Sequence, residues 1–138
     1  MKKTLCLVMA TVLLLSLCAC SGGISVDEAQ ATVKDFFNAI ANEEYDAAES
    51  LLHPDRPADI EEYILAIEKD LGIDFSQGID IEKYTGYSSY LHDSSVGGSI
   101  YGLTMEISVE DTTLVCSIET VRNDNGYGIY NFVLDTQQ

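Results

Sequence analysis

The sequence predicts an α+β domain in which three N-terminal helices pack on a curved antiparallel sheet of about four strands. Apolar residues recur every three to four positions as far as Leu71, which is the helical period. Beyond Gly72 they recur at every second position, which is the strand period. Helices and strands in separate runs along the chain are typical of α+β domains, with the helices on one face of the sheet.

The segment before this domain has the pattern of a signal peptide. Lys2 and Lys3 precede an apolar run over residues 5–17, shorter than the ~20 residues that a membrane-spanning helix needs. Ala19, a small residue, stands directly before Cys20. An ordinary secretory signal cleaved after Ala19 and an uncleaved membrane helix are the weaker alternatives.

The tetrapeptide Leu17-Cys18-Ala19-Cys20 indicates a bacterial lipobox. We therefore expect residues 1–19 to be removed, Cys20 to carry the lipid, and residues 20–24 to form a short tether to a single domain over residues 25–138. Two or more acyl chains hold a protein stably on a membrane. The predicted location is extracytoplasmic, with the protein anchored to the bacterial membrane by its lipid.

The composition of the mature chain argues against two classes of partner. Removal of residues 1–19 leaves 119 residues that keep 5 basic and 23 acidic side chains, a formal charge of −18. Nucleic-acid binders need clustered Lys and Arg, so a nucleic-acid partner is not expected. Contact of the domain with an anionic lipid surface needs the same kind of cluster.

The cysteine count predicts no disulfide and no metal centre. With Cys20 used for the lipid, Cys116 is the one cysteine left in the mature chain and has no cysteine to pair with. Its apolar strand setting predicts a buried thiol. The Cys/His spacing of zinc sites is missing, and the acidic residues between 70 and 82 lack the calcium-loop pattern. We expect no cofactor.

Each predicted helix has a start or stop signal. Ser25 and Glu28 form a capping box for a helix that runs to about Ala41. A second helix is predicted from Glu43 to His53, with Asn42 as its cap and Pro54 as its stop. A third follows Pro57 and ends near Leu71, where Gly72 suits the position after the helix.

The strands are predicted over residues 78–91, 100–109, 113–121 and 127–135, with a loop at 92–98. We expect Ile118 to lie opposite Phe132 and Cys116 opposite Leu134, because this pairing joins the two apolar faces. It leaves a three-residue loop, 124–126, between the last two strands. A two-residue turn at 125–126 is not favoured, because a slip of one residue inverts every side chain.

These features resemble the cystatin-like roll of the nuclear-transport-factor-two-like superfamily. The segments that carry the resemblance are "NEEYDAAESLL" in the helical part and "GYGIYNFVL" in the last strand. The chain is similar in particular to small bacterial lipoproteins that carry this domain, over about residues 25–135. The resemblance implies a cone-shaped fold that often encloses a pocket, in a superfamily with both enzymes and non-enzymatic binding domains. The fold therefore does not choose the function.

Enzymes of that superfamily that abstract protons use a carboxylate and a tyrosine in an apolar pocket. The inward faces predicted for the last three strands carry no Asp, Glu or His, and general acid–base chemistry needs such a group. If the protein were such an enzyme, Glu62 or Asp70 would provide the carboxylate and Tyr63 the tyrosine. His53 is expected to stabilise a helix end and His92 to be solvated. Pocket-lining candidates are Tyr101, Met105, Tyr130 and Phe132.

The sequence therefore predicts a non-catalytic binding or interaction domain on a lipid anchor. Its alternative is a small-pocket isomerase, lyase or hydrolase. Val115, Ile129 and Val133 are predicted on the outer sheet face, where an apolar strip marks a contact surface. That face is the predicted place for a protein partner or a homodimer.

Overall fold

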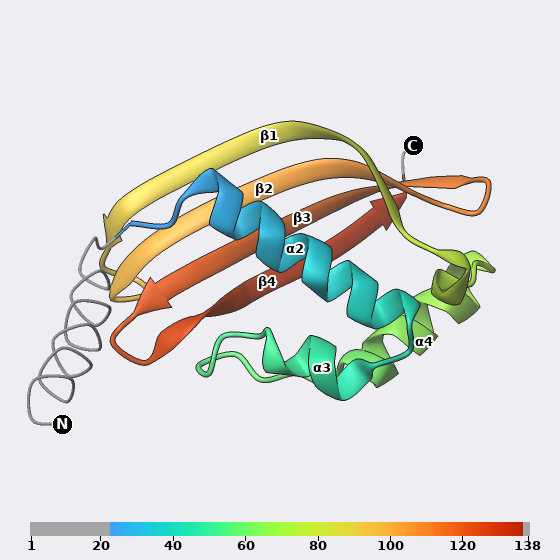
Figure 1. Cartoon of the computed structure of the whole chain (residues 1–138), viewed down its shortest axis with the longest axis horizontal. Helices are drawn as coiled ribbons and strands as arrows, with labels where there is room; N and C mark the ends of the chain where they lie inside the picture. Colours follow the sequence, from blue (N-terminus) through green and yellow to red (C-terminus); the bar gives the residue numbers. More distant parts are fainter. Residues whose placement is uncertain (1–22, 137–138) are drawn as a thin grey trace, which may run out of the picture.

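A computed structural model describes residues 23–136 and confirms the α+β class (Figure 1). The predicted signal peptide and Cys20 lie outside these residues. The elements in chain order are α2 (Val26–Ala41), α3 (Tyr45–Ser50), α4 (Ile60–Leu71), the 3₁₀ turn η2 (Phe75–Gln77), β1 (Asp80–Asp93), β2 (Gly98–Val109), β3 (Thr112–Asn123) and β4 (Gly126–Thr136). None of the helices described here has the length and apolar content needed to cross a membrane.

Helix α2 begins and ends as predicted and supplies the helical side of the core. The Ser25 side chain accepts a hydrogen bond from the Glu28 N–H at 3.2 Å, which satisfies one free donor of the first turn. The face that carries Val33, Phe36 and Ile40 is buried. Figure 1 shows this helix lying along the concave face of the sheet.

Helix α3 is shorter than predicted at both ends. Glu43 has a φ of 57°, so the chain leaves helical geometry before the helix begins at Tyr45. After Ser50 the backbone turns toward β4, where Leu52 and Ile129 form an isolated parallel bridge. The expected helix from Glu43 to His53 is therefore wrong at its termini, because pairing with β4 competes with its last turn.

Helix α4 follows Pro57 and ends before Gly72, as predicted, and its N-cap is Asp59. The Asp59 side chain caps the helix by accepting from the Glu62 N–H at 2.8 Å. Gly72 closes it with a φ of 67°, a left-handed conformation that glycine adopts without strain. Ile60 and Ile64 face the core.

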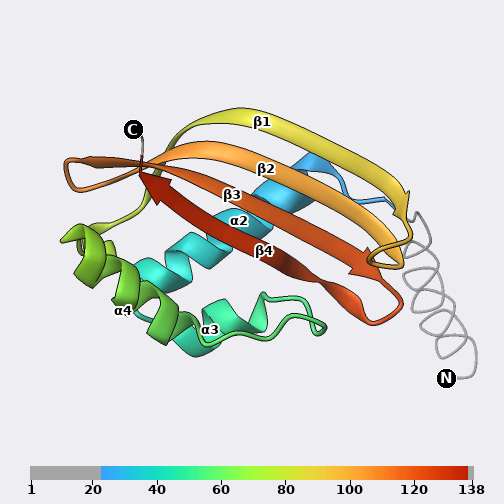
Figure 2. The same ribbon diagram turned by 180° about the vertical axis from the view of Figure 1, so that it is seen from behind.

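The four strands form one antiparallel sheet in the order β1-β2-β3-β4, so β1 and β4 are its edges. All the helices lie on one side, and Figure 2 shows the opposite, convex face free of helices. The concave face is filled by apolar side chains of strands and helices, with Met105, Leu114 and Phe36 fully buried. Burial of Cys116 is also confirmed, and it raises the pKa of this thiol to about 12.

The register of β3 and β4 is confirmed, but the predicted loop between them is wrong. Ile118 pairs with Phe132 and Cys116 with Leu134, as expected. The connection is nevertheless a two-residue loop, because Asn123 pairs with Gly126. A β-bulge at Tyr130 inserts one extra residue into β4 and reconciles this loop with the register beyond it.

The bulge also corrects the placement of Ile129. This residue pairs with Thr120 and lies on the concave side, with only 1 % of its surface exposed. It therefore belongs to the core and not to an outer contact face.

Candidate functional site

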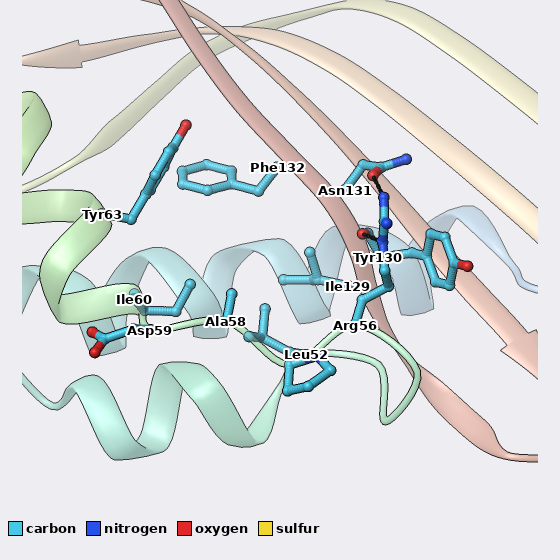
Figure 3. A pocket seen from close by; sticks show the side chains of 11 residues that line it. Leu52, Arg56, Ala58, Asp59, Ile60, Tyr63, Ile129, Tyr130, Asn131 and Phe132 are labelled. Carbon is cyan, nitrogen blue, oxygen red and sulfur yellow. Dashed lines mark hydrogen bonds between the residues drawn. The ribbon is translucent and has the colours of Figure 1, made fainter.

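The main candidate site is a groove of about 410 Å³ between β4 and the chain that leads from α3 into α4 (Figure 3). One wall comes from Leu52 and the residues that lead into α4, and the other from residues 129–132 of β4. The lining is mainly apolar: Leu52, Pro57, Ala58, Ile60, Ile129 and Phe132, with Arg56, Asp59, Tyr63, Tyr130 and Asn131 at its polar positions. This is the composition expected of a ligand groove.

Arg56 holds one end of the groove. Its Nη2 donates to Asn131 Oδ1 at 2.8 Å, and its Nε donates to the Tyr130 carbonyl at 3.4 Å. The guanidinium lies 4.8 Å from the centre of the Tyr130 ring, within the range of a cation–π contact. Figure 3 shows Arg56 reaching across from its loop to β4. A cation is thus held beside an apolar floor.

Tyr63 and Phe132 form the other end. Their rings are 5.5 Å apart at 66°, and Phe132 in turn contacts the buried Phe36 ring at 5.1 Å and 81°. Such edge-to-face contacts stabilise aromatic pairs. Burial raises the pKa of Tyr63, while a hydrogen bond with the backbone of Leu134 lowers it in part. The hydroxyl is therefore protonated at neutral pH and is hydrogen-bonded to the backbone of Leu134 at the edge of β4.

The backbone of β4 is open between these two ends. Ile129 directs its N–H and C=O away from β3, to Leu51 O at 2.9 Å and to the His53 N–H at 2.8 Å. Beyond the bulge, Asn131 pairs with Glu119, and antiparallel partners alternate between bonded and unbonded pairs. Leu134, two residues beyond Phe132, bonds through its backbone to Tyr63 outside the sheet. We infer from this alternation that Phe132 also directs its N–H and C=O outward, and the turn, loop and cap hydrogen bonds within residues 23–136 do not include them.

His53 lies behind the groove, in contact with Tyr130 of its lining. Its Nδ1 accepts from the Asp55 N–H at 3.1 Å, which leaves Nε2 as the donor to Asn123 Oδ1 and to the Gly126 carbonyl, both at 3.1 Å. The side chain is fully buried, and its ring packs on Tyr130. Because both ring nitrogens are engaged, His53 has a structural role that joins the loop after α3 to the β3–β4 turn.

Asp55 continues this network at the surface. Asn123 Nδ2 donates to its carboxylate at 3.0 Å, and Asn125 Nδ2 donates at 2.9 Å. These hydrogen bonds, the one from Asn123 first, lower the pKa of Asp55 because they stabilise the ionised form. The loop that carries Arg56 is therefore tied to the turn at 124–125.

The predicted pocket residues divide into two groups. Tyr130 and Phe132 line the groove, whereas Met105 is fully buried in the core and Tyr101 packs against the core outside the groove. Arg56 was not predicted. Its sequence signal is weak: Arg56 is one of only seven basic residues of the chain and stands between Pro54 and Pro57.

The alternative suppliers of acid–base chemistry are also separated by the fold. Tyr63 lines the groove, but Glu62 and Asp70 are exposed and do not. The carboxylate in the lining is Asp59, which accepts the α4 capping hydrogen bond. Within residues 23–136 no three His, Cys, Asp or Glu side chains gather as metal ligands would.

The convex sheet face differs from the predicted apolar strip. Val133 is 55 % exposed and Val115 is half-buried, but Ile129 is absent from this face. A hollow crosses the four strands there, and small or polar residues alternate in its lining with apolar ones: Gly86, Tyr87, Ser88, Gly102, Leu103, Thr104, Ser117, Ile118, Glu119, Asn131 and Val133. Lys83 and Glu106 form an ion pair at 3.0 Å between β1 and β2.

Comparisons of this chain with protein-family models, with curated proteins and with solved structures found no match. The candidate site is therefore interpreted from its own geometry.

Proposed function

We propose that the protein is a lipid-anchored lipoprotein of the bacterial envelope whose domain holds a short extended peptide segment in the groove beside β4, without catalysis. The observation that carries this proposal is the open backbone of Phe132 beside an apolar groove. The α+β order and the curved sheet agree with the proposed resemblance to the cystatin-like roll. The alternative, an enzyme with a pocket inside the cone, has less support because apolar side chains fill the concave face.

An extended segment fits because the β4 edge already pairs with an extended segment of the same chain at Ile129. Residues 51–53 pair with Ile129 as a short added strand. The groove continues their line along β4, past Phe132. A bound segment would exchange hydrogen bonds with the Phe132 N–H and C=O, which is the way peptides add to an exposed sheet edge.

The lining of the groove also determines which type of side chain the bound segment would place there. A residue that pairs with Phe132 would place one side chain against Leu52, Ala58 and Ile60, so an apolar residue is favoured. Arg56 stands beside this position and favours a carboxylate or a backbone carbonyl next to it.

The variant Ala58→Trp tests the groove. Ala58 is exposed and lines the groove, so a bulky ring there is expected to fill the space without disturbing the core. The probe is a displayed library of random dodecapeptides, selected on the soluble domain from residue 23 onward after its fold has been checked by NMR. We expect selected peptides to shift the amide signals of Phe132 and Leu134, and Ala58→Trp to weaken their binding at least about tenfold, or ~1.4 kcal/mol.

Ala47→Trp is the matched control, since Ala47 is an exposed alanine in α3 outside the groove. It is expected to leave binding unchanged. Peptides that bind equally to both variants, or a library that yields no binder, would remove the peptide proposal.

The variant Cys20→Ala tests the anchor separately. Without the thiol no lipid can be attached, so the protein is expected to move from the membrane fraction to the soluble fraction and to lose incorporation of labelled palmitate. Cys116→Ala is the control, because that cysteine is buried and should leave labelling intact. Labelling that persists in Cys20→Ala would contradict the lipid anchor.

A further inference from the structure

The last part of β1 exposes large apolar side chains close to the tether. Leu91 is 77 % exposed and Tyr90 is 56 % exposed, on the outer edge strand of the sheet. Leu91 is the most exposed of the large apolar residues described. Single apolar side chains are common on protein surfaces, so the meaning of these two depends on what lies beside them. We call Tyr90 and Leu91 the edge patch.

The edge patch lies against the point where the described chain begins. A Cβ atom built on Gly23 would be 3.3 Å from Leu91 Cδ2, so the two residues are in contact. Arg122 Nη1 donates to the Gly23 carbonyl at 2.9 Å and fixes this end of the chain on the domain. Figures 1 and 2 both show the end of β1 beside the first described residues.

The distance from Gly23 to Cys20 brings the edge patch to the bilayer. Two residues, Ser21 and Gly22, separate the two positions. The three Cα–Cα steps from Cys20 to Gly23 span only about 10 Å even when the chain is fully extended. A lipid on Cys20 therefore holds Gly23, and Leu91 beside it, within roughly the thickness of a headgroup layer from the membrane.

The local composition suits this position, in contrast to the acidic remainder of the chain. Between Lys83 and Tyr101 the acidic and basic side chains are limited to His92 and Asp93. Tyrosine and leucine are side chains that membranes accept at the boundary between headgroups and acyl chains. Near Gly23, the positive charge of Arg122 is paired with Glu28.

We infer that Tyr90 and Leu91 insert into the headgroup–acyl boundary of the membrane that carries the lipid anchor, so that the domain docks on its β1 edge. The inference rests on the proposed attachment of lipid to Cys20. Because β4 is the opposite edge of the sheet, docking on β1 directs the groove beside β4 away from the membrane. The lipid surface preferred is zwitterionic, since the domain is strongly acidic elsewhere.

A single tryptophan reports the docking, because the chain has no tryptophan of its own. Lipidated full-length Leu91→Trp is reconstituted in phosphatidylcholine vesicles whose acyl chains carry bromine, a contact quencher. We expect a blue-shifted emission spectrum and loss of about half of the emission or more, as for a side chain buried about 5–10 Å into the boundary. Leu71→Trp is the matched control, since Leu71 is partly exposed at the end of α4, and its emission should match that in vesicles without bromine.

Mass spectrometry of the same samples separates the two proposals. A protein that carries the lipid mass but shows no quenching at position 91, or equal quenching at positions 91 and 71, overturns docking and leaves the anchor intact. A protein without the lipid mass overturns the anchor and the docking with it. Replacement of phosphatidylcholine by phosphatidylglycerol is expected to reduce the quenching, and an increase would contradict the preference for a zwitterionic surface.

Discussion

Gly128→Ala is expected to destabilise the domain by about 3 kcal/mol, as an overpacked site with rigid neighbours does. A Cβ atom at this position would lie 2.6 Å from both Leu52 C and His53 N, and 2.8 Å from Leu51 O. All three are backbone atoms, so no side chain can rotate to make room. The methyl group must push residues 51–53 away from β4 and break their hydrogen bonds with Ile129.

The measurement is the free energy of unfolding from urea denaturation of the soluble domain. A loss of 3 kcal/mol is a large part of the 5–15 kcal/mol typical of a domain. Gly86→Ala is the matched control, because it is also a strand glycine but its Cβ would meet Thr104 at an ordinary 3.4 Å. We expect it to change stability by less than about 0.5 kcal/mol. Equal effects of the two substitutions would show that residues 51–53 are not held against β4.

The importance of Gly128 explains why the groove is harder to predict from sequence than the helices. Helix α2 is specified locally, by the Ser25–Glu28 capping box and an apolar stripe of helical period. The groove instead depends on the approach of residues 51–53 to Gly128, about 75 positions away in the chain. Nothing in a local pattern distinguishes this glycine from one in a flexible turn.

The bulge in β4 shows a second limit of the alternation rule. Ile129 and Tyr130 are adjacent and both apolar, so either can face the core without violating a period of two. The pairing of Ile118 with Phe132 was predictable because it joins two apolar faces. The loop and the bulge before it were not, because they compensate each other and leave that pairing unchanged.

The groove and the edge patch lie on opposite edges of the sheet, and the fold treats the two edges differently. The β4 edge is covered at Ile129 by residues 51–53 and tied at Tyr130 by Arg56, which leaves the opening at Phe132. The β1 edge has exposed apolar side chains and contact with Gly23. An uncovered sheet edge invites pairing with other chains. Docking of β1 on a membrane would restrict such pairing there and leave β4 for a specific ligand.

His53→Leu is expected to cost about 3 kcal/mol of stability and to loosen the groove. Leucine fills most of the space of the ring but offers no hydrogen bond to the Asp55 N–H, to Asn123 or to the Gly126 carbonyl. A buried polar group that loses its partner costs roughly 1–3 kcal/mol, and more than one is affected. The variant therefore separates the role of hydrogen bonds from that of packing behind the groove.

Urea denaturation measures the loss, and hydrogen exchange locates it. Amides of the segment around Asp55 and of the turn at 124–125 should exchange faster in His53→Leu, while those in the middle of β2 should change less. His92→Leu is the control, because His92 is exposed on β1, and its stability should stay within about 0.5 kcal/mol of the parent. If His53→Leu were as stable as the parent, the buried network could not be what joins the loop of Arg56 to the β3–β4 turn, and packing of the side chain at position 53 against Tyr130 would have to do so.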